Sequence, residues 1–155
     1  MAKFYAADEE IQNLVHEVAA ELGLEQYMDF ETLCVPKAKE VVTVSKASAL
    51  AEFLSNRDDL ILVMVFDEVF SQFDEKTKYM FIRMAMDKIS YDSEKDKIVL
   101  DCPMITLPVG FYQKYEKVAV DTALLGQMSI AQWEDKKKQE KEEKKALKTK
   151  KKKSE

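Results

Sequence analysis

The chain's single histidine stands where a zinc motif could begin. His16 is followed by Glu17, as in HExxH, but the second histidine that the motif requires at position 20 is replaced by Ala20. Zinc in proteins is held by imidazole, thiolate or carboxylate donors. Glu21 lies about 140° around a helix from His16, so it is a poor second ligand. We therefore expect His16 to be a surface histidine.

An acidic turn offers a second place for metal chemistry. Asp92, Glu94 and Asp96 alternate like the first three ligands of a calcium loop. That loop also needs a glycine at its sixth position and a glutamate at its twelfth, which are occupied by Lys97 and Pro103. The pattern favours a polar turn over a metal site.

The sequence offers no general base that could activate a serine or cysteine nucleophile. A Ser-His or Cys-His pair would have to use His16, and no spacing supports such a pair. The three glycines are isolated, so no phosphate-binding loop is expected. Arg83 and Asp87 are four residues apart on one predicted helix and could pair with each other. We interpret that pair as a structural or specificity feature.

A lysine-rich C-terminal tail is the strongest electrostatic feature. Residues 136–155 contain 11 lysines and 4 glutamates, a net charge of +7, whereas the other 135 residues carry a net charge of −12. Polycations bind nucleic acid by releasing counterions from phosphates. The tail could instead dock an acidic protein, fold back on the acidic body or act only as a solubilising segment. The candidate binding residues are Lys144, Lys145, Lys148, Lys150, Lys151, Lys152 and Lys153.

The sequence of the N-terminal half predicts two helices and several strands. Apolar residues at helical spacing predict a helix from about Asp8 to Leu22. The β-branched runs at residues 32–35 and 40–44 predict either two strands or one strand that is interrupted at Pro36. Ser45 or Ser48 could cap a short helix that ends near Ser55. The run LILVMVF, residues 60–66, has no polar alternation and predicts a central strand that is covered on both faces.

A helix capped by Asp74 is expected to run to about Ser90. Its sequence is apolar on nearly every side, which is typical of a buried helix. Its methionines, together with Met64, are interpreted as core, with an adaptable apolar groove for a partner as the alternative.

The C-terminal part predicts further elements. They are a turn at residues 90–96, a strand from Lys97 to Leu100 with a continuation toward Ile105 as the alternative, a helix from Pro108 to about Leu125 that Gly126 closes, and a last helix behind a capping box at Ser129. That last helix should fray into a disordered segment at residues 148–155.

These elements predict an α+β fold. A small sheet packs on the buried central helix in one domain, residues 1–133, and residues 134–155 form a charged, partly disordered helical extension. Cys34 and Cys102 are expected to be buried thiols in a reducing cytoplasm. No apolar run approaches the roughly 20 residues that span a bilayer, and no signal peptide is apparent, so a soluble protein is expected.

The stretch LILVMVF–DEVFSQFDEKTK–FIRMAMDKI, followed by an acidic turn and a strand, resembles the phage metallopeptidase-like family. The resemblance implies an α+β fold in which FIRMAMDKI corresponds to a helix that bears the zinc motif. The two zinc histidines then fall on Met84 and Lys88, and the general-base glutamate falls on Ala85. None of these side chains can perform its role, so the resemblance implies a degenerate member without zinc.

The function predicted from the sequence is a non-enzymatic, phage-type accessory or structural binding protein on a metallopeptidase-like scaffold. Its partner would be another protein of a phage assembly, and no cofactor is expected. The location would be the cytoplasm of the host cell, with the virion as the alternative. Two alternatives are kept: a metal-dependent hydrolase with scattered Asp and Glu ligands, and a nucleic-acid-associated protein that acts through its lysine tail.

Overall fold

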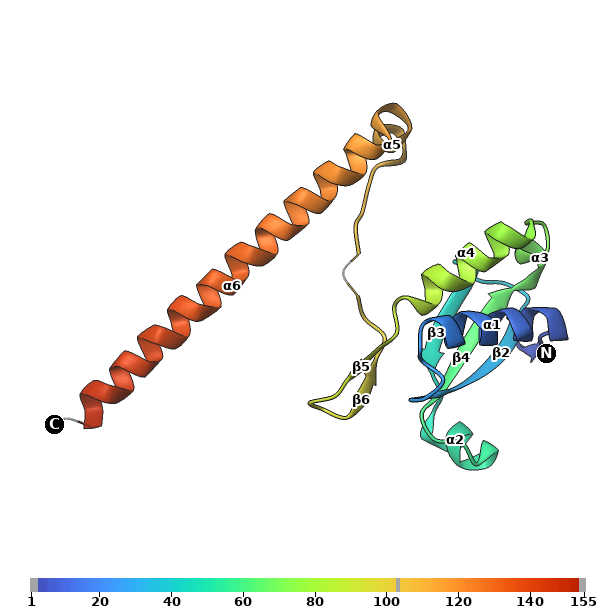
Figure 1. Ribbon diagram of the computed structural model, residues 1–155, viewed down its shortest axis with the longest axis horizontal. Helices are drawn as coiled ribbons and strands as arrows, with labels where there is room; N and C mark the ends of the chain where they lie inside the picture. Colours follow the sequence, from blue (N-terminus) through green and yellow to red (C-terminus); the bar gives the residue numbers. More distant parts are fainter. Residues whose placement is uncertain (1–2, 103, 154–155) are drawn as a thin grey trace. The chain divides into compact units, whose positions relative to one another are not determined.

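A computed structural model describes residues 3–102 and 104–153, although not the side chains of residues 150–153 (Figure 1). The contacts divide the chain after Cys102 into an N-terminal unit and a C-terminal unit. The predicted boundary near residue 133 lies within the C-terminal unit, inside its long last helix. The architecture is α+β, as expected.

The N-terminal unit is built on a four-stranded mixed sheet. Its strands are β1 (Tyr5–Ala6), β2 (Asp29–Val35), β3 (Val42–Lys46) and β4 (Leu60–Phe66), in the order β1-β2-β4-β3. β4 runs parallel to β2 and antiparallel to β3. The apolar run at residues 60–66 therefore forms an internal strand, which confirms the prediction of a central strand.

Two helices cover one face of this sheet. α1 (Glu9–Glu21) contacts β2, α4 (Glu75–Met86) contacts β3, and the two helices contact each other (Figure 1). Each begins at an aspartate, because a carboxylate satisfies amide groups at a helix N-terminus. Asp8 accepts a hydrogen bond from the Ile11 amide at 3.0 Å, and Asp74 accepts one from the Thr77 amide at 2.9 Å.

The hydrophobic core lies between the sheet and these helices. Ile61, Val63 and Val65 of β4 are fully buried, because alternate side chains of a strand point to the same face. Leu62, Met64 and Phe66 point the other way and are only half-buried. The expectation of a strand buried on both faces thus holds for one face only.

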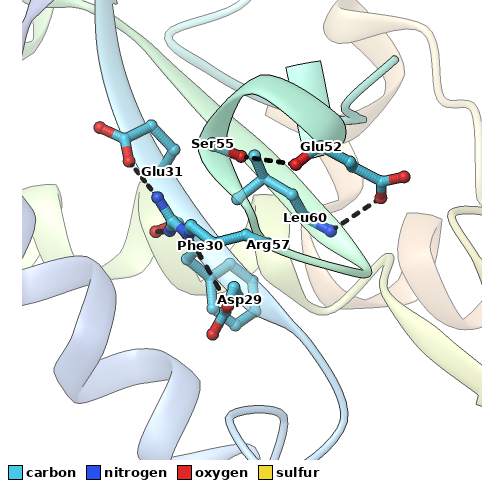
Figure 2. A network of polar contacts seen from close by, with 7 residues as sticks. All are labelled: Asp29, Phe30, Glu31, Glu52, Ser55, Arg57 and Leu60. Carbon is cyan, nitrogen blue, oxygen red and sulfur yellow. Dashed lines mark hydrogen bonds and ion pairs between the residues drawn. The ribbon is translucent and has the colours of Figure 1, made fainter. Parts of the chain in front are cut away.

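A short helix, α2 (Ala49–Ser55), precedes β4 and is held by polar contacts at its C-terminal end. Ser48 caps its start, as one of the two predicted serines. Arg57 donates from Nη1 to Glu31 Oε2 at 2.6 Å and from Nη2 to the Phe30 carbonyl at 2.7 Å (Figure 2). Figure 2 also shows the Leu60 amide donating to Glu52 at 3.1 Å. These contacts tie α2 and the start of β4 to β2.

The helix predicted to be buried is covered on one face only. α4 ends at Met86, not at Ser90, and it buries Ile82, Ala85 and Met86. Met80 and Met84 are 54% and 60% exposed. The prediction of burial on nearly every side is therefore wrong, because α1 and the sheet contact the inner face of this helix and leave Met80 and Met84 largely exposed.

Short elements surround α4 in the chain. α3 (Asp67–Phe70) leads from β4 to the Asp74 cap, and a hairpin of β5 (Ser90–Asp92) and β6 (Lys97–Val99) follows. The predicted turn at residues 90–96 is confirmed for residues 93–96 only, since residues 90–92 form β5, a strand that was not predicted. β6 ends at Val99 and does not continue toward Ile105.

The C-terminal unit consists of α5 (Val109–Tyr115) and α6 (Lys117–Lys153), which are separated at Glu116, where φ is 45°. The predicted helix end at Gly126 and helix start at Ser129 are wrong, since both residues lie inside α6. A single glycine costs a helix only about 1 kcal/mol, which good helix formers on either side can offset. The predicted disorder from Lys148 is also wrong as far as Lys153, where α6 ends. Lysine and glutamate have high helix propensity, so they can continue a helix that does not pack against another element. Residues 154–155 lie outside the described part.

Candidate functional site

An apolar groove of about 440 Å³ runs along the outer face of α4. It is lined by Thr77, Met80, Phe81, Arg83, Met84 and Asp87. Most of these positions follow one another at three- or four-residue steps, which places their side chains on one side of the helix. The same helix therefore anchors itself in the core by one face and presents a mainly apolar surface with the other.

The methionines of this helix divide between the two faces. Met86 is fully buried and is part of the core, as the sequence predicted. Met80 and Met84 line the groove, which corresponds to the alternative of an adaptable apolar groove. Phe81 lies between them in the chain, and its ring packs against Phe73 with a centroid distance of 5.0 Å. Methionine is flexible and polarisable, so such a surface can adapt to different apolar side chains.

A charged cluster borders the groove at Arg83. Its Nη1 atom donates to the Tyr79 hydroxyl at 3.1 Å and to Glu21 Oε2 at 3.2 Å, and Tyr79 donates to the same carboxylate. The hydrogen bond with Tyr79 raises the pKa of Arg83 above its ordinary value. Arg83 Nε also lies 3.6 Å from Asp87 Oδ1, which confirms the predicted pair, although both side chains are partly exposed. The guanidinium of Arg83 thus lies between two carboxylates, and the cluster beside the apolar lining carries a formal net charge of −1.

The three positions implied by the metallopeptidase resemblance do not share an environment. Met84 faces the groove, Ala85 is buried in the core, and Lys88 lies after α4 with its ammonium 3.7 Å from Glu40 Oε2. Because these three side chains point in different directions, they cannot bind the same metal ion.

The two other candidate metal positions form ordinary polar contacts. His16 is exposed, as predicted, and its Nδ1 atom lies 3.3 Å from Glu25 Oε1. Asp92 Oδ1 accepts hydrogen bonds from the amides of Glu94 and Lys95 at 3.1 and 3.2 Å, so the acidic turn is a polar turn. Within residues 3–102 and 104–153, no three His, Cys, Asp or Glu side chains are grouped so that they could hold a metal ion.

The lysine tail is the last part of α6. Lys144, Lys145 and Lys148 are exposed on this helix. Lys150, Lys151, Lys152 and Lys153 continue the helical backbone, and their side chains lie outside the described part. The nearest aromatic side chain in the helix is the exposed Trp133, whose ring lies 5.7 Å from Lys137 Nζ. The candidate residues thus lie on one continuous helix.

Two features of the N-terminal unit bear on its chemistry. Burial raises the pKa of the Cys34 thiol to about 11, with the nearby Asp67 and Asp8 charges as smaller causes, so this cysteine is a poor nucleophile at neutral pH. Cys102 is partly exposed, whereas the sequence predicted a buried thiol.

The exposed apolar residues of α2 were not predicted from the sequence. Phe53 is 81% exposed. The signal that could have indicated this surface is the presence of three large apolar residues in a helix of seven residues.

The helices of the described part include none that has both the length and the apolar character needed to span a membrane. Searches with protein-family models, among curated proteins and among solved structures give no match to this chain.

Proposed function

We propose that this chain is a non-enzymatic accessory protein that binds another protein through the outer face of α4. The observation that carries the proposal is the exposure of Met80 and Met84 along an apolar groove of about 440 Å³. Large apolar side chains that cluster on an otherwise charged surface mark interaction sites. The non-enzymatic part of the proposal rests on Met84, Ala85 and Lys88, which cannot act as zinc ligands or as a base.

The length of the lined surface favours a helical segment as its occupant. From Thr77 to Asp87 the helix rises by about 15 Å, which is close to three turns. A partner helix of that length can place two or three apolar side chains, spaced three or four residues apart, along the groove beside Met80 and Met84. The partner we expect is a protein with such an amphipathic segment.

The biological setting of the proposal comes from the resemblance to the phage metallopeptidase-like family, which remains a prediction. The run of β4, α3 and α4, followed by the turn at residues 93–96 and β6, supports it, although β5 adds a strand before the turn that the resemblance does not include. Under this proposal the partner belongs to a phage assembly, and the scaffold has kept the fold while its metal site has been lost.

The experiment compares two glutamate substitutions in the N-terminal unit. Met84→Glu places a charge in the groove, whereas Leu50→Glu alters a similarly exposed residue of α2 and serves as the matched control. Proteins that copurify with the wild-type chain are identified, and the affinity of each is then measured with both variants by titration calorimetry. The proposal predicts a partner that binds wild type and Leu50→Glu but binds Met84→Glu at least tenfold more weakly.

Two results would contradict the proposal. One is a set of partners that bind all three proteins equally well. The other is stoichiometric zinc in the purified protein together with peptidase activity, which would favour the alternative of a metal-dependent hydrolase.

The lysine tail supports a second candidate function, nucleic-acid binding. The specific observation is that the lysines of residues 136–149 are exposed along α6, so that they can contact a phosphate backbone. Binding to DNA or RNA should then weaken steeply with salt and disappear when residues 136–155 are removed. Unchanged binding by the truncated chain would exclude the tail as the contact.

A further inference from the structure

The C-terminal unit exposes many large apolar side chains. Only Ala119 is buried among the side chains described for this unit. Ten large apolar residues between positions 109 and 133 are at least 40% exposed: Val109, Phe111, Tyr112, Tyr115, Val118, Leu124, Leu125, Met128, Ile130 and Trp133. Large apolar side chains that gather on one exposed surface mark an interaction site. This segment therefore requires a partner surface.

The length of the apolar segment limits what can cover it. After Trp133 the character of α6 changes, since residues 134–149 include a single large apolar residue, Leu147. The apolar part of α6, residues 118–133, extends over about 24 Å. Its exposed side chains, together with those of α5, offer roughly 1,000 Å², which is similar to the roughly 800 Å² that each partner contributes to a standard interface.

The charges of the chain favour a second copy as the partner. Residues 1–102 contain 11 basic and 21 acidic residues, a net charge of −10, whereas residues 136–155 carry a net charge of +7. The apolar segment 118–133 contains only one charged residue, Asp121. Two copies can therefore join their apolar segments without an opposing charge, and the basic tail of each copy is attracted by the acidic unit of the other.

The same charges select the direction of pairing. In a parallel pair the two +7 tails would lie side by side, about 10 Å apart, and would repel each other. In an antiparallel pair that is centred between Leu125 and Gly126, Val118 of one copy lies opposite Trp133 of the other. The tails then point to opposite ends, and each begins beside the α5 side of the partner helix.

We propose that two copies of this chain associate through α5 and the first half of α6, with the two α6 helices antiparallel. The arrangement is a two-fold symmetric four-helix cluster, in which each copy contributes the same surface. The residues of this interface belong to the C-terminal unit, and none of them lines the α4 groove.

Analytical ultracentrifugation of the full-length chain tests the association. The wild-type protein should sediment with twice the 17.9 kDa of one chain. Leu125→Glu should reduce the association constant at least a hundredfold, because it places two carboxylates at the centre of the pair. Leu147→Glu is the matched control, since Leu147 is 62% exposed on the same helix, compared with 68% for Leu125, but lies outside the apolar segment. Circular dichroism verifies that both variants remain folded.

A wild-type protein that sediments as a monomer at every soluble concentration would overturn the proposal. A dimer that Leu147→Glu disrupts and Leu125→Glu does not would overturn it equally.

The direction of the helices is tested by a spin label at Lys145→Cys, in a chain whose Cys34 and Cys102 are replaced by alanine. The antiparallel pair predicts a distance of about 60 Å between the two labelled positions, whereas a parallel pair predicts about 10 Å between the helix axes. A short distance between the labels would refute the antiparallel arrangement.

Discussion

Replacing Arg57 with alanine should destabilise the N-terminal unit, because this one side chain joins the α2–β4 connection to β2. Its guanidinium donates to Glu31 at 2.6 Å and to the Phe30 carbonyl at 2.7 Å, and its Nε atom lies 3.6 Å from Asp29 Oδ2 (Figure 2). Alanine removes all three contacts and leaves the turn before β4 attached through the Glu52 side chain and the sheet.

The magnitude follows from the exposure of the partners. Asp29 and Glu31 are about half exposed, so water replaces much of the lost attraction and the two ion pairs together contribute about 1 kcal/mol. The hydrogen bond from the charged guanidinium to the Phe30 carbonyl contributes about 1.5 kcal/mol more. The expected loss of unfolding free energy is therefore about 2.5 kcal/mol, which lowers the Tm of a unit of this size by roughly 10–20 °C.

Differential scanning calorimetry is the appropriate assay, because the only tryptophan, Trp133, lies in the C-terminal unit and its fluorescence would not follow the N-terminal unit. Arg57→Lys should lose about half as much stability, since a single ammonium cannot reproduce the planar fork. Lys95→Ala removes an exposed pair, 4.0 Å from Asp92, and should change the free energy by less than about 0.5 kcal/mol. Equal Tm values for Arg57→Ala and Lys95→Ala would refute the reasoning.

Four further predictions concern single residues. Hydrogen bonds from Thr77 hold the pKa of Asp74 below its ordinary 3.8. The charged carboxylate therefore stabilises the fold above pH 3.8, and this contribution is lost as the pH falls through the lowered pKa. Asp74→Asn should reduce the difference between the unfolding free energies measured in urea at pH 6 and at pH 3. With a pKa near 11, Cys34 should react with iodoacetamide at pH 8 far more slowly than the partly exposed Cys102, as followed by mass spectrometry. Phe70→Ala should cost about 4 kcal/mol by calorimetry, because this ring is fully buried. Gly126→Ala should increase the helical signal in far-UV circular dichroism, because no atom lies within 4 Å of the added methyl group and alanine favours a helix by about 1 kcal/mol.

Local chemistry predicted the starts of α1 and α4 and left Ser45 and Ser48 as the two candidates for the start of α2. Asp8, Ser48 and Asp74 each accept a hydrogen bond from an amide three residues later, a preference that depends only on the neighbouring backbone. The uninterrupted apolar run at residues 60–66 likewise identified the internal strand, because a strand without polar residues is stable only where it is covered.

Helix ends in the C-terminal unit could not be determined in this way. Gly126 and Ser129 are typical of helix termini, yet both lie inside α6. A glycine or serine favours a terminus only slightly, and the good helix formers on both sides outweigh that preference. The reverse holds at Glu116, where a positive φ separates α5 from α6 although glutamate is an ordinary helix residue.

The candidate site shows the same division between local and tertiary information. The sequence determined that α4 is rich in methionine and that Met84, Ala85 and Lys88 cannot bind zinc. Only the tertiary structure decided which methionines are covered, because α1 and the sheet approach α4 from one side, bury Met86 and leave Met80 and Met84 along the groove. The sequence shows that a side chain is apolar, but whether that side chain is buried depends on contacts with residues that are far away in the chain.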